Sequence, residues 1–246
     1  MITIKNVSKS YKKGEKVIDK LNLKIKDGEI FGFIGLNGAG KTTTIKMMTG
    51  ILEIDEGKIL IDNINIEKNP VGAKEKLGVV LDNPDTFLKL RGIEYLKFIA
   101  DAYGVPVEKR IENVEKYSKI FEMENELNNR IEKYSHGMRQ KIIIIGALLH
   151  EPKNLILDEP ITGLDPKSTF DLKNIMREYA EKGNTVFFST HILEIAEKLC
   201  DRVGIINKGK LIYVGTLERL KEKYPENNSL EDIFINIIKG EENWIN

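Results

Sequence analysis

Apolar and polar residues alternate along the first part of the chain. The alternation runs through residues 2–7 and again through residues 21–25, with Gly-containing turn signals at residues 13–14 and 27–28. A period of two places successive side chains on opposite faces of a strand. The pattern therefore predicts an antiparallel β layer at the start of the chain.

Several later segments are apolar at nearly every position. They are residues 29–34, 154–157, 185–188 and 203–206, with 77–81 as a further candidate. A continuous apolar run is typical of a strand that is buried on both faces of a parallel sheet. Helix-compatible segments lie between these runs, so we expect an α/β domain with a doubly wound sheet and right-handed crossovers.

Residues 84–150 interrupt this alternation of strands and helices. Residues 93–103, 107–121 and 137–149 all suit helices, and no strand-like run lies securely between them. We therefore predict a helical subdomain that is inserted into the α/β core.

These patterns divide the chain into three parts. Residues 1–83 and 151–220 form the core, residues 84–150 the helical subdomain, and residues 221–246 a C-terminal helical tail. In the tail, Ser229 can cap a helix. The apolar residues of that helix fall on one face: Leu230, Ile233, Phe234, Ile237 and Ile238.

Composition and charge limit the partners and the cellular location that we expect for this protein. The 246 residues are 41% hydrophobic and 31% charged, and 38 Lys and Arg balance 38 Asp and Glu. No long-range field would therefore steer the molecule onto nucleic acid or an anionic bilayer. The single cysteine, Cys200, cannot close an internal disulfide, and the first residues show no basic segment followed by an apolar one. We therefore expect a cytosolic protein. Its longest apolar stretch, residues 142–149, is far shorter than the roughly 20 residues that span a bilayer, so no segment is expected to cross a membrane unaided.

A phosphate-binding motif occupies residues 35–42. They read G-x-x-x-x-G-K-T, directly after a predicted strand and before a helix-compatible segment that starts at Thr43. Glycines let backbone N–H groups approach phosphate oxygens, Lys41 would neutralise the β and γ phosphates, and the Thr42 hydroxyl would ligate Mg²⁺. This context favours a nucleotide site over a Gly-rich turn without a ligand. The expected nucleotide-binding residues are Gly35, Leu36, Asn37, Gly38, Ala39, Gly40, Lys41, Thr42 and Thr43.

Two carboxylates follow a second apolar run. Asp158 and Glu159 come directly after residues 154–157, and open α/β sheets place their ligands at the carboxyl ends of the strands. Asp158 can hold Mg²⁺ through water, while Glu159 can orient or deprotonate an attacking water. An acidic pair after a strand is more often a solvated turn, but a phosphate loop in the same chain reverses that preference. Glu159 therefore indicates nucleotide hydrolysis rather than binding alone.

A third motif stands at residues 134–140, which read Tyr-Ser-His-Gly-Met-Arg-Gln ahead of a helix and the acidic strand. It resembles the signature of the ATP-binding cassette (ABC) ATPases, usually Leu-Ser-Gly-Gly-Gln, and the resemblance extends over nearly the whole chain. Ser135 and Gly137 match the signature, whereas His136 and Met138 depart from it. The resemblance implies a P-loop (RecA-like) parallel-sheet core with an N-terminal antiparallel β layer, and a helical subdomain that carries the signature. Ser135 would also suit an ordinary helix N-cap.

Other positions are similar to the family as well. Residues 163–165 look like its D-loop, and His191 follows a predicted strand, as the family's switch histidine does. A histidine there can donate to a γ-phosphate oxygen, so the resemblance implies catalytic roles for Lys41, Glu159 and His191. Tyr11 matches the aromatic residue on which the family stacks adenine, although a Tyr in a β layer is more often part of the core.

Asp82 departs from the family, which normally has a Gln at this position. Its carboxylate would still be an oxygen ligand for Mg²⁺, but it adds negative charge near the γ-phosphate. The expected metal site therefore comprises Thr42, Asp158 and Asp82. Asp82, the altered signature and residues 229–234 together resemble the ABC-2-like branch of the family, which exports drugs and bacteriocins. If these differences are neutral drift instead, the direction of transport stays open.

The resemblance implies an ATPase subunit that powers a membrane transporter, with ATP and Mg²⁺ as cofactors. Two cassettes would stack head to tail, so that Ser135 and Gly137 of one chain complete the ATP site of the other. The partners would be a second copy or a paralogue and a separate transmembrane permease that docks near Asp82 and the helical subdomain. No nucleic-acid partner is expected, and the subunit would lie at the cytoplasmic face of the membrane.

Other functions fit the sequence less well. A soluble cassette protein that acts on ribosomes or DNA usually has two cassettes or a long coiled insert, and this sequence has neither, nor a long basic tract. A GTPase is excluded because residues 207–210 lack the Asp that would pair with guanine. A nucleotide switch without catalysis is disfavoured by the presence of Lys41, Asp158, Glu159 and His191.

Overall fold

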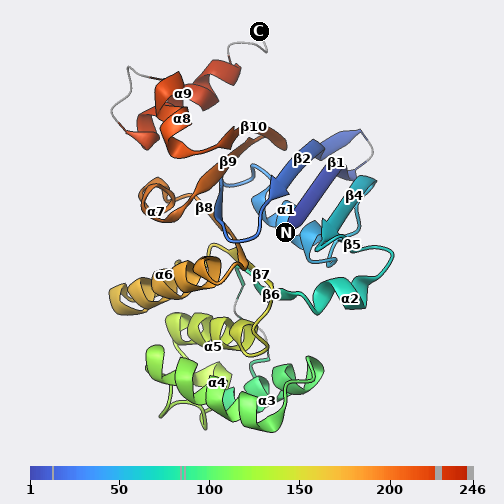
Figure 1. Cartoon of the computed structure of the whole chain (residues 1–246). Coiled ribbons are helices and arrows are strands. Elements are labelled where there is room, and N and C mark those ends of the chain that lie inside the picture. Colours follow the sequence, from blue (N-terminus) through green and yellow to red (C-terminus); the bar gives the residue numbers. More distant parts are fainter. Residues whose placement is uncertain (13, 84, 86, 225–228, 243–246) are drawn as a thin grey trace.

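The computed structural model describes residues 1–12, 14–83, 85, 87–224 and 229–242. Figure 1 shows an antiparallel β layer, a larger sheet beside it, and a group of helices at the lower end of the molecule.

The larger sheet has six strands in the order β10-β9-β3-β8-β7-β6. All are parallel except β10, which runs antiparallel to β9 at one edge. The bounds are β3 (Ile30–Ile34), β6 (Leu77–Val80), β7 (Asn154–Asp158), β8 (Thr185–Thr190), β9 (Arg202–Asn207) and β10 (Lys210–Gly215). Each apolar run of the sequence thus forms a parallel strand, and the predicted α/β class is confirmed.

The smaller sheet is antiparallel and has the order β2-β1-β4-β5. The predicted pair β1 and β2 is present, with Ile2 opposite Ile25. The sequence did not predict β4, β5 or β10, because these strands are short or largely exposed and lack a long apolar pattern. The bounds are β1 (Ile2–Lys12), β2 (Glu15–Ile25), β4 (Glu56–Ile61) and β5 (Ile64–Asn65).

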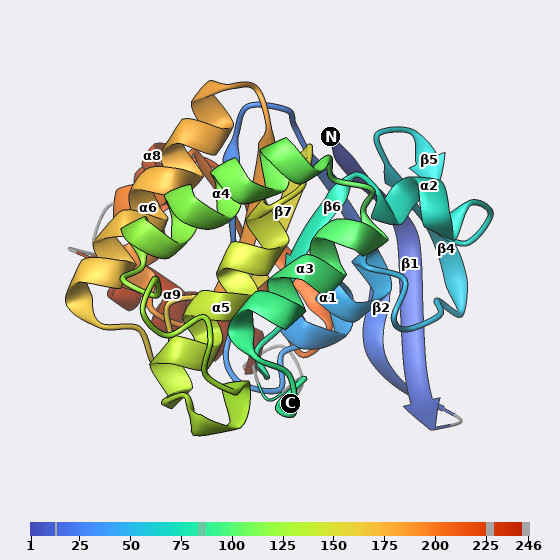
Figure 2. The ribbon, with the colours of Figure 1, turned by 90° about the horizontal axis from the view of Figure 1, so that it is seen from below.

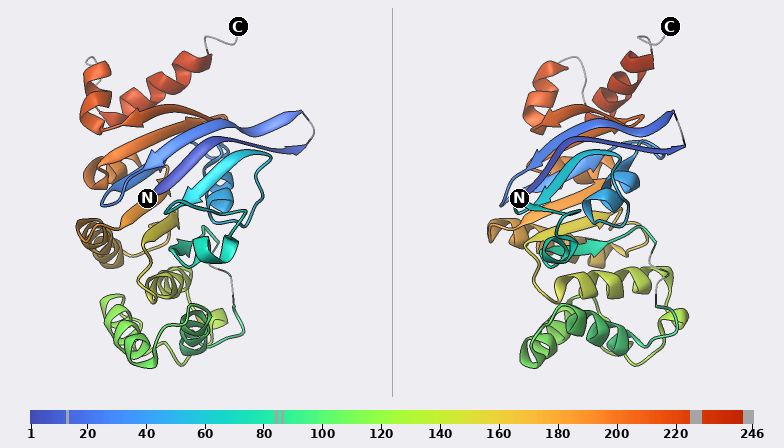
Figure 3. Two further views of the ribbon diagram at one scale, coloured as in Figure 1. Left: turned by 45° about the vertical axis from the view of Figure 1, so that its right-hand side comes forward. Right: turned by 90° about the vertical axis from the view of Figure 1, so that its right-hand side faces the viewer.

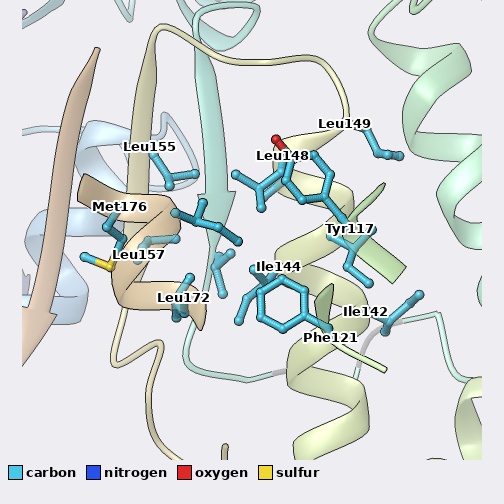
Figure 4. Close-up of a cluster of buried hydrophobic side chains, with 14 of the residues drawn as sticks. Tyr117, Phe121, Ile142, Ile144, Leu148, Leu149, Leu155, Leu157, Leu172 and Met176 are labelled. Atoms are coloured by element: carbon cyan, nitrogen blue, oxygen red, sulfur yellow. The ribbon is translucent and has the colours of Figure 1, made fainter. Parts of the chain in front are cut away.

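The two faces of the larger sheet bury different cores, because successive side chains of a strand point to opposite faces. Ile156 and Phe187 lie in one core, with side chains of α1 and of the antiparallel layer. Leu157 and Phe188 lie in the other, with side chains of α5 and α6, and Figure 4 shows part of this second core. The three helices are α1 (Lys41–Met48), α5 (His136–Leu148) and α6 (Pro166–Glu181).

The three helices predicted between residues 84 and 150 are present. They are α3 (Gly92–Ala102), α4 (Val107–Ile120) and α5, with a short 3₁₀ helix over Ile131–Lys133 before α5. Viewed from below, α3 and α4 lie in front of α5, and the strands β6 and β7 lie behind it (Figure 2). This position between two layers explains the long apolar stretch of the sequence, since α5 is buried along most of its length. None of the helices in the described residues is both long and apolar enough to cross a membrane.

The C-terminal helices lie at the end of the molecule opposite the helical subdomain (Figure 3). Ser229 caps α9 as predicted, since its Oγ accepts the backbone N–H of Asp232 at 3.1 Å. Four of the predicted apolar residues are buried, and the side chain of Ile238 lies outside the described part. The predicted boundary after residue 220 falls within α8, so this helix spans it. The remaining bounds are α2 (Pro70–Lys74), α7 (Leu193–Leu199), α8 (Leu217–Lys223) and α9 (Leu230–Glu242).

Candidate active site

A cavity of about 250 Å³ lies where the phosphate loop joins β3 to α1. Its walls combine loop residues with side chains that follow β6 and β7, whose carboxyl ends meet at this edge of the sheet. Val17 of β2 also contributes, and no sequence motif indicated it. The lining residues are Val17, Leu36, Asn37, Gly38, Gly40, Lys41, Thr42, Thr43, Asp82 and Glu159.

The conformation of the phosphate loop depends on its glycines. Gly38 and Gly40 have φ angles of 81° and 110°, a region that favours glycine. A Cβ on Gly35 would lie 2.6 Å from the carbonyl oxygen of Ile206. The loop therefore packs closely against β9 and leads into α1. The first backbone N–H groups of a helix attract anions.

Lys41 is the cation of this cavity. Its side chain is only 6% exposed, and its Nζ donates to the carbonyl oxygen of Gly35 at 2.8 Å and lies 3.4 Å from Glu159 Oε1. A buried ammonium needs such partners because desolvation otherwise makes its charge costly. The lysine charge is thereby held between the loop and the end of β7.

Asp158 and Ser189 form a buried pair at the ends of β7 and β8. Ser189 Oγ donates to Asp158 Oδ1 at 2.5 Å and accepts the backbone N–H of Glu159 at 3.0 Å. Burial raises the pKa of the Asp158 carboxyl, and the charges of Asp82 and Glu159 act in the same direction, against the hydroxyls of Ser189 and Thr42. The structure therefore brings the three predicted metal ligands, Thr42, Asp82 and Asp158, to one place. The sequence motifs assigned no role to Ser189, whose hydroxyl contacts both Asp158 and the backbone of Glu159.

The side-chain oxygen atoms of Thr42, Asp82 and Asp158 suit a hard cation. Asp158 Oδ2 is buried and has no hydrogen-bond partner among the described residues. Within the same residues, no group of three or more His, Cys, Asp and Glu side chains is arranged to hold a metal ion by itself. Two carboxylates and the Thr42 hydroxyl are oxygen ligands of the kind that Mg²⁺ takes when phosphate and water complete its shell. The residues therefore fit Mg²⁺ bound together with a nucleotide.

Glu159 is held from both sides. Oε1 faces Lys41, and Oε2 lies 3.0 Å from Nδ1 of His191, which follows β8. The backbone of Glu159 has φ 48°, an uncommon conformation for a residue with a side chain, and such conformations cluster at active sites. His191 is 49% exposed, whereas the Glu159 side chain is 12% exposed. The carboxylate is thus fixed in the cavity wall, with the imidazole at its outer side.

Tyr11 lies beside the phosphate loop rather than in the core. Its ring is 59% exposed, and its hydroxyl is 3.3 Å from Thr43 Oγ1. An exposed aromatic ring at the mouth of a nucleotide cavity is suited to stack on a base.

Ser135 and Gly137 do not line the cavity. Ser135 is the N-cap of α5, since its Oγ accepts the backbone N–H of Met138 at 3.2 Å. A Cβ on Gly137 would lie 2.6 Å from the carbonyl oxygen of Gly163, so the signature packs closely on the D-loop. A single chain therefore leaves the signature residues outside its own nucleotide cavity.

An ion pair fastens the D-loop to α5. Lys141 Nζ lies 2.7 Å from Asp165 Oδ2, and this ammonium holds the pKa of Asp165 well below its usual range. Asp165 also caps α6 by accepting the backbone N–H of Ser168 at 2.8 Å. The sequence motifs did not indicate this pairing.

Several known proteins with similar sequences are named as transporter or resistance ATP-binding proteins. Residues 18–162 match the family described as "ABC transporter". The chain is 34% identical to the ABC transporter ATP-binding protein NatA of Bacillus subtilis, over 98% of this chain and 99% of that protein. It is 38% identical to the bacitracin transport ATP-binding protein BcrA of Bacillus licheniformis, over 85% of this chain and 68% of that protein.

Solved structures agree with these matches. An ATP-binding subunit of an ABC transporter superposes with a TM-score of 0.92 at 31% identity, over 96% of this chain and 99% of that chain. A dimeric ATP-binding cassette in a post-hydrolysis state, bound to ADP and Pi, superposes with a TM-score of 0.79 at 26% identity, over 88% of this chain and 99% of that one.

Proposed function

The chain belongs to the ABC transporter family, and from this premise we propose that it is an ATPase subunit that binds ATP between two copies and drives a separate membrane permease. One observation carries the proposal: Ser135 and Gly137 lie outside the cavity that contains Lys41 and Glu159. If the signature residues and the cavity residues contact the same ATP molecule, a second chain must supply the signature.

The described contacts support a role for each residue in hydrolysis. Lys41 and the loop amides bind the phosphates. Thr42, Asp82 and Asp158 would hold Mg²⁺, which would supply positive charge to the phosphate oxygens. Glu159 accepts a proton from the attacking water, whose oxygen bonds to the terminal phosphorus as the bond from phosphorus to the ADP oxygen breaks. His191 donates to the phosphate oxygens.

The names of two relatives support a permease partner and transport of a drug-like substrate. They are named for bacitracin transport and linearmycin resistance, and Asp82 and the altered signature also favour the drug-export branch. We therefore place the subunit at the cytoplasmic face of the membrane, as part of an exporter. A cassette that acts on ribosomes or DNA is not favoured, because the matching proteins described above are transporter or resistance proteins.

Exchange of Ser135 for Asp tests whether the site is shared. Asp caps helices as well as Ser does, so Ser135→Asp should preserve α5, whereas its charge would repel a phosphate. We expect normal ATP binding to the single chain and suppressed hydrolysis. Mixing Ser135→Asp chains with Lys41→Ala chains should restore activity, because one site of each mixed dimer combines an intact Lys41 with an intact Ser135.

Hydrolysis rates of the separate and mixed chains are the measurement. Thr216→Asp is a matched control, since Thr216 caps α8 far from the signature, and it should retain full activity. Mixed dimers that form but show no recovered activity would contradict the shared site.

Asp82→Gln tests the metal ligand that is particular to this chain. A charged oxygen gains more from a divalent hard cation than an amide oxygen does, so the variant should require more Mg²⁺ for half-maximal hydrolysis. The Mg²⁺ dependence of the rate, measured for both proteins at saturating ATP, decides the question. Identical half-saturation would eliminate the metal-ligand role of Asp82.

A further inference from the structure

A second polar cavity lies at the opposite end of the strands from the nucleotide cavity. Its volume is about 300 Å³, and no residue lines both cavities. Glu151 lies shortly before β7 and Asn184 directly before β8, whereas the nucleotide cavity lies at the carboxyl ends of the strands. The length of the strands therefore separates the two cavities. The residues that line the second cavity are Lys116, Tyr117, Glu151, Tyr179, Lys182 and Asn184.

This second cavity lies between the helical subdomain and the core. Lys116 and Tyr117 belong to α4 of the subdomain. Tyr179 lies in the last turn of α6, and Lys182 directly follows that helix. A molecule bound in the cavity would therefore contact both parts of the protein and hold them together.

Two buried tyrosines form part of the cavity wall. Tyr117 and Tyr179 are 4% and 7% exposed, and the buried hydroxyl of Tyr179 has no hydrogen-bond partner among the described residues. Burial raises the pKa of Tyr117 to about 12, and the charges of Glu151 and Glu178 act in the same direction. Burial also raises the pKa of Tyr179. Both phenols are therefore O–H donors at neutral pH, and a buried donor without a partner in the chain indicates an acceptor from outside it.

The charges around the cavity favour an anion. Lys116 and Lys182 are exposed, and neither ammonium forms an ion pair within the part of the chain that the structure describes. Lys116 Nζ lies 4.9 Å from the centroid of the Tyr117 ring. The opposing carboxylate of Glu151 is already paired, since its Oε1 lies 3.0 Å from Lys109 Nζ. Two unpaired cations beside hydroxyl donors match an oxyanion with two negative charges, for which lysines act as point charges.

We propose that the second cavity binds a small molecule that carries a phosphate group. The ammoniums of Lys116 and Lys182 neutralise its charge, and the hydroxyls of Tyr117 and Tyr179 donate hydrogen bonds to its oxygen atoms. A volume of about 300 Å³ lies at the lower end of the range of small-molecule sites. This site does not depend on the shared ATP site, because the two cavities have no residue in common.

Thermal unfolding of the full-length chain in a series of inorganic phosphate concentrations tests the site, because a ligand that binds the folded state raises the thermal midpoint. All variants carry Lys41→Ala, since the phosphate loop also attracts phosphate, and sodium chloride keeps the ionic strength constant. In this background phosphate should still raise the midpoint. Tyr179→Phe and Lys182→Ala should each weaken phosphate binding about 10-fold, the loss expected for a hydrogen bond to a charged group.

The chain offers two matched controls, Tyr103→Phe and Lys119→Ala. The Tyr103 hydroxyl donates to the carbonyl oxygen of Leu77 at 3.3 Å, and Lys119 lies on α4. Neither residue lines the cavity, so both variants should bind phosphate as the background does. Without phosphate, Tyr103→Phe should unfold at a lower temperature because it loses a hydrogen bond. Tyr179→Phe should not, because it removes a buried group that has no partner.

A phosphate monoester, glycerol phosphate, distinguishes the two sources of the phosphate group. Tighter binding of the ester assigns the site to a phosphorylated small molecule, and tighter binding of inorganic phosphate assigns it to the free ion.

Three results would overturn the proposal. One is a midpoint that phosphate raises no more than sodium chloride of equal ionic strength does. Another is an equal loss of phosphate binding in the variants of the cavity and in their controls. The third is phosphate binding that Lys41→Ala abolishes, since the phosphate would then lie in the phosphate loop.

Discussion

Glu159→Gln is expected to lower the rate of ATP hydrolysis about 10²–10⁴-fold, the contribution of one positioned proton acceptor. The amide has nearly the same shape as the carboxylate but cannot take the proton of the attacking water. It also removes the negative charge that Lys41 and His191 contact from either side. ATP binding should persist, and less repulsion between the carboxylate and the phosphates should favour the closed dimer.

Two measurements check this expectation. Phosphate release gives the rate, and size-exclusion chromatography with ATP should show a stable dimer of Glu159→Gln chains. Glu122→Gln is the matched control, because Glu122 also has a positive φ, 56°, and an ion pair, to Lys167 at 2.8 Å, but lies outside the cavity. A variant that hydrolyses at the wild-type rate or stays monomeric would refute the role of Glu159 as base.

Lys41→Ala is expected to weaken ATP binding about 100-fold, near the upper end of what a hydrogen bond to a charged group contributes. The substitution removes a buried cation from the cavity wall and leaves Glu159 facing the phosphates without the lysine ammonium. The fold should survive, because α1 packs through Ile45, Met47 and Met48 and not through Lys41.

Titration calorimetry with ATP measures the loss, and thermal unfolding checks the fold. Lys46→Ala, on the last turn of the same helix, removes a cation without touching the cavity and should bind ATP as the wild type does. Unchanged affinity in Lys41→Ala would contradict the assignment of residues 35–42 as the phosphate loop.

The phosphate loop was predictable from the sequence because its geometry is local. Residues 35–42 follow one strand and open one helix, and the left-handed φ angles fall on Gly38 and Gly40. Backbone sterics and a contiguous motif therefore suffice to specify the conformation of this loop. The buried parallel strands were predictable for a similar reason, since burial on both faces leaves an uninterrupted apolar run.

Strands with an exposed side were less evident. β10 is an edge strand, and β4 has only the two-residue strand β5 on one of its sides. The burial of both strands is partial. Whether such short, mixed sequences form strands depends on the neighbouring strands with which they pair. The local sequence pattern does not reveal these neighbours.

Several features of the site were decided by the tertiary structure alone. The strand order places β3, β8, β7 and β6 side by side, and this order brings Lys41, His191, Glu159 and Asp82 to one edge although the chain separates them widely. The hydrogen bonds of Ser189 and the ion pair between Lys141 and Asp165 likewise depend on which strands and helices become neighbours.

The sequence by itself determined which chemistry the chain carries, because residue types and short motifs define ligands and proton acceptors. The tertiary structure decided which of these residues lie close together. It joins Lys41 and Glu159 in one cavity, places His191 against Glu159 and keeps Ser135 outside the cavity. These long-range contacts follow from strand order and crossover connections and not from any local period of apolar residues.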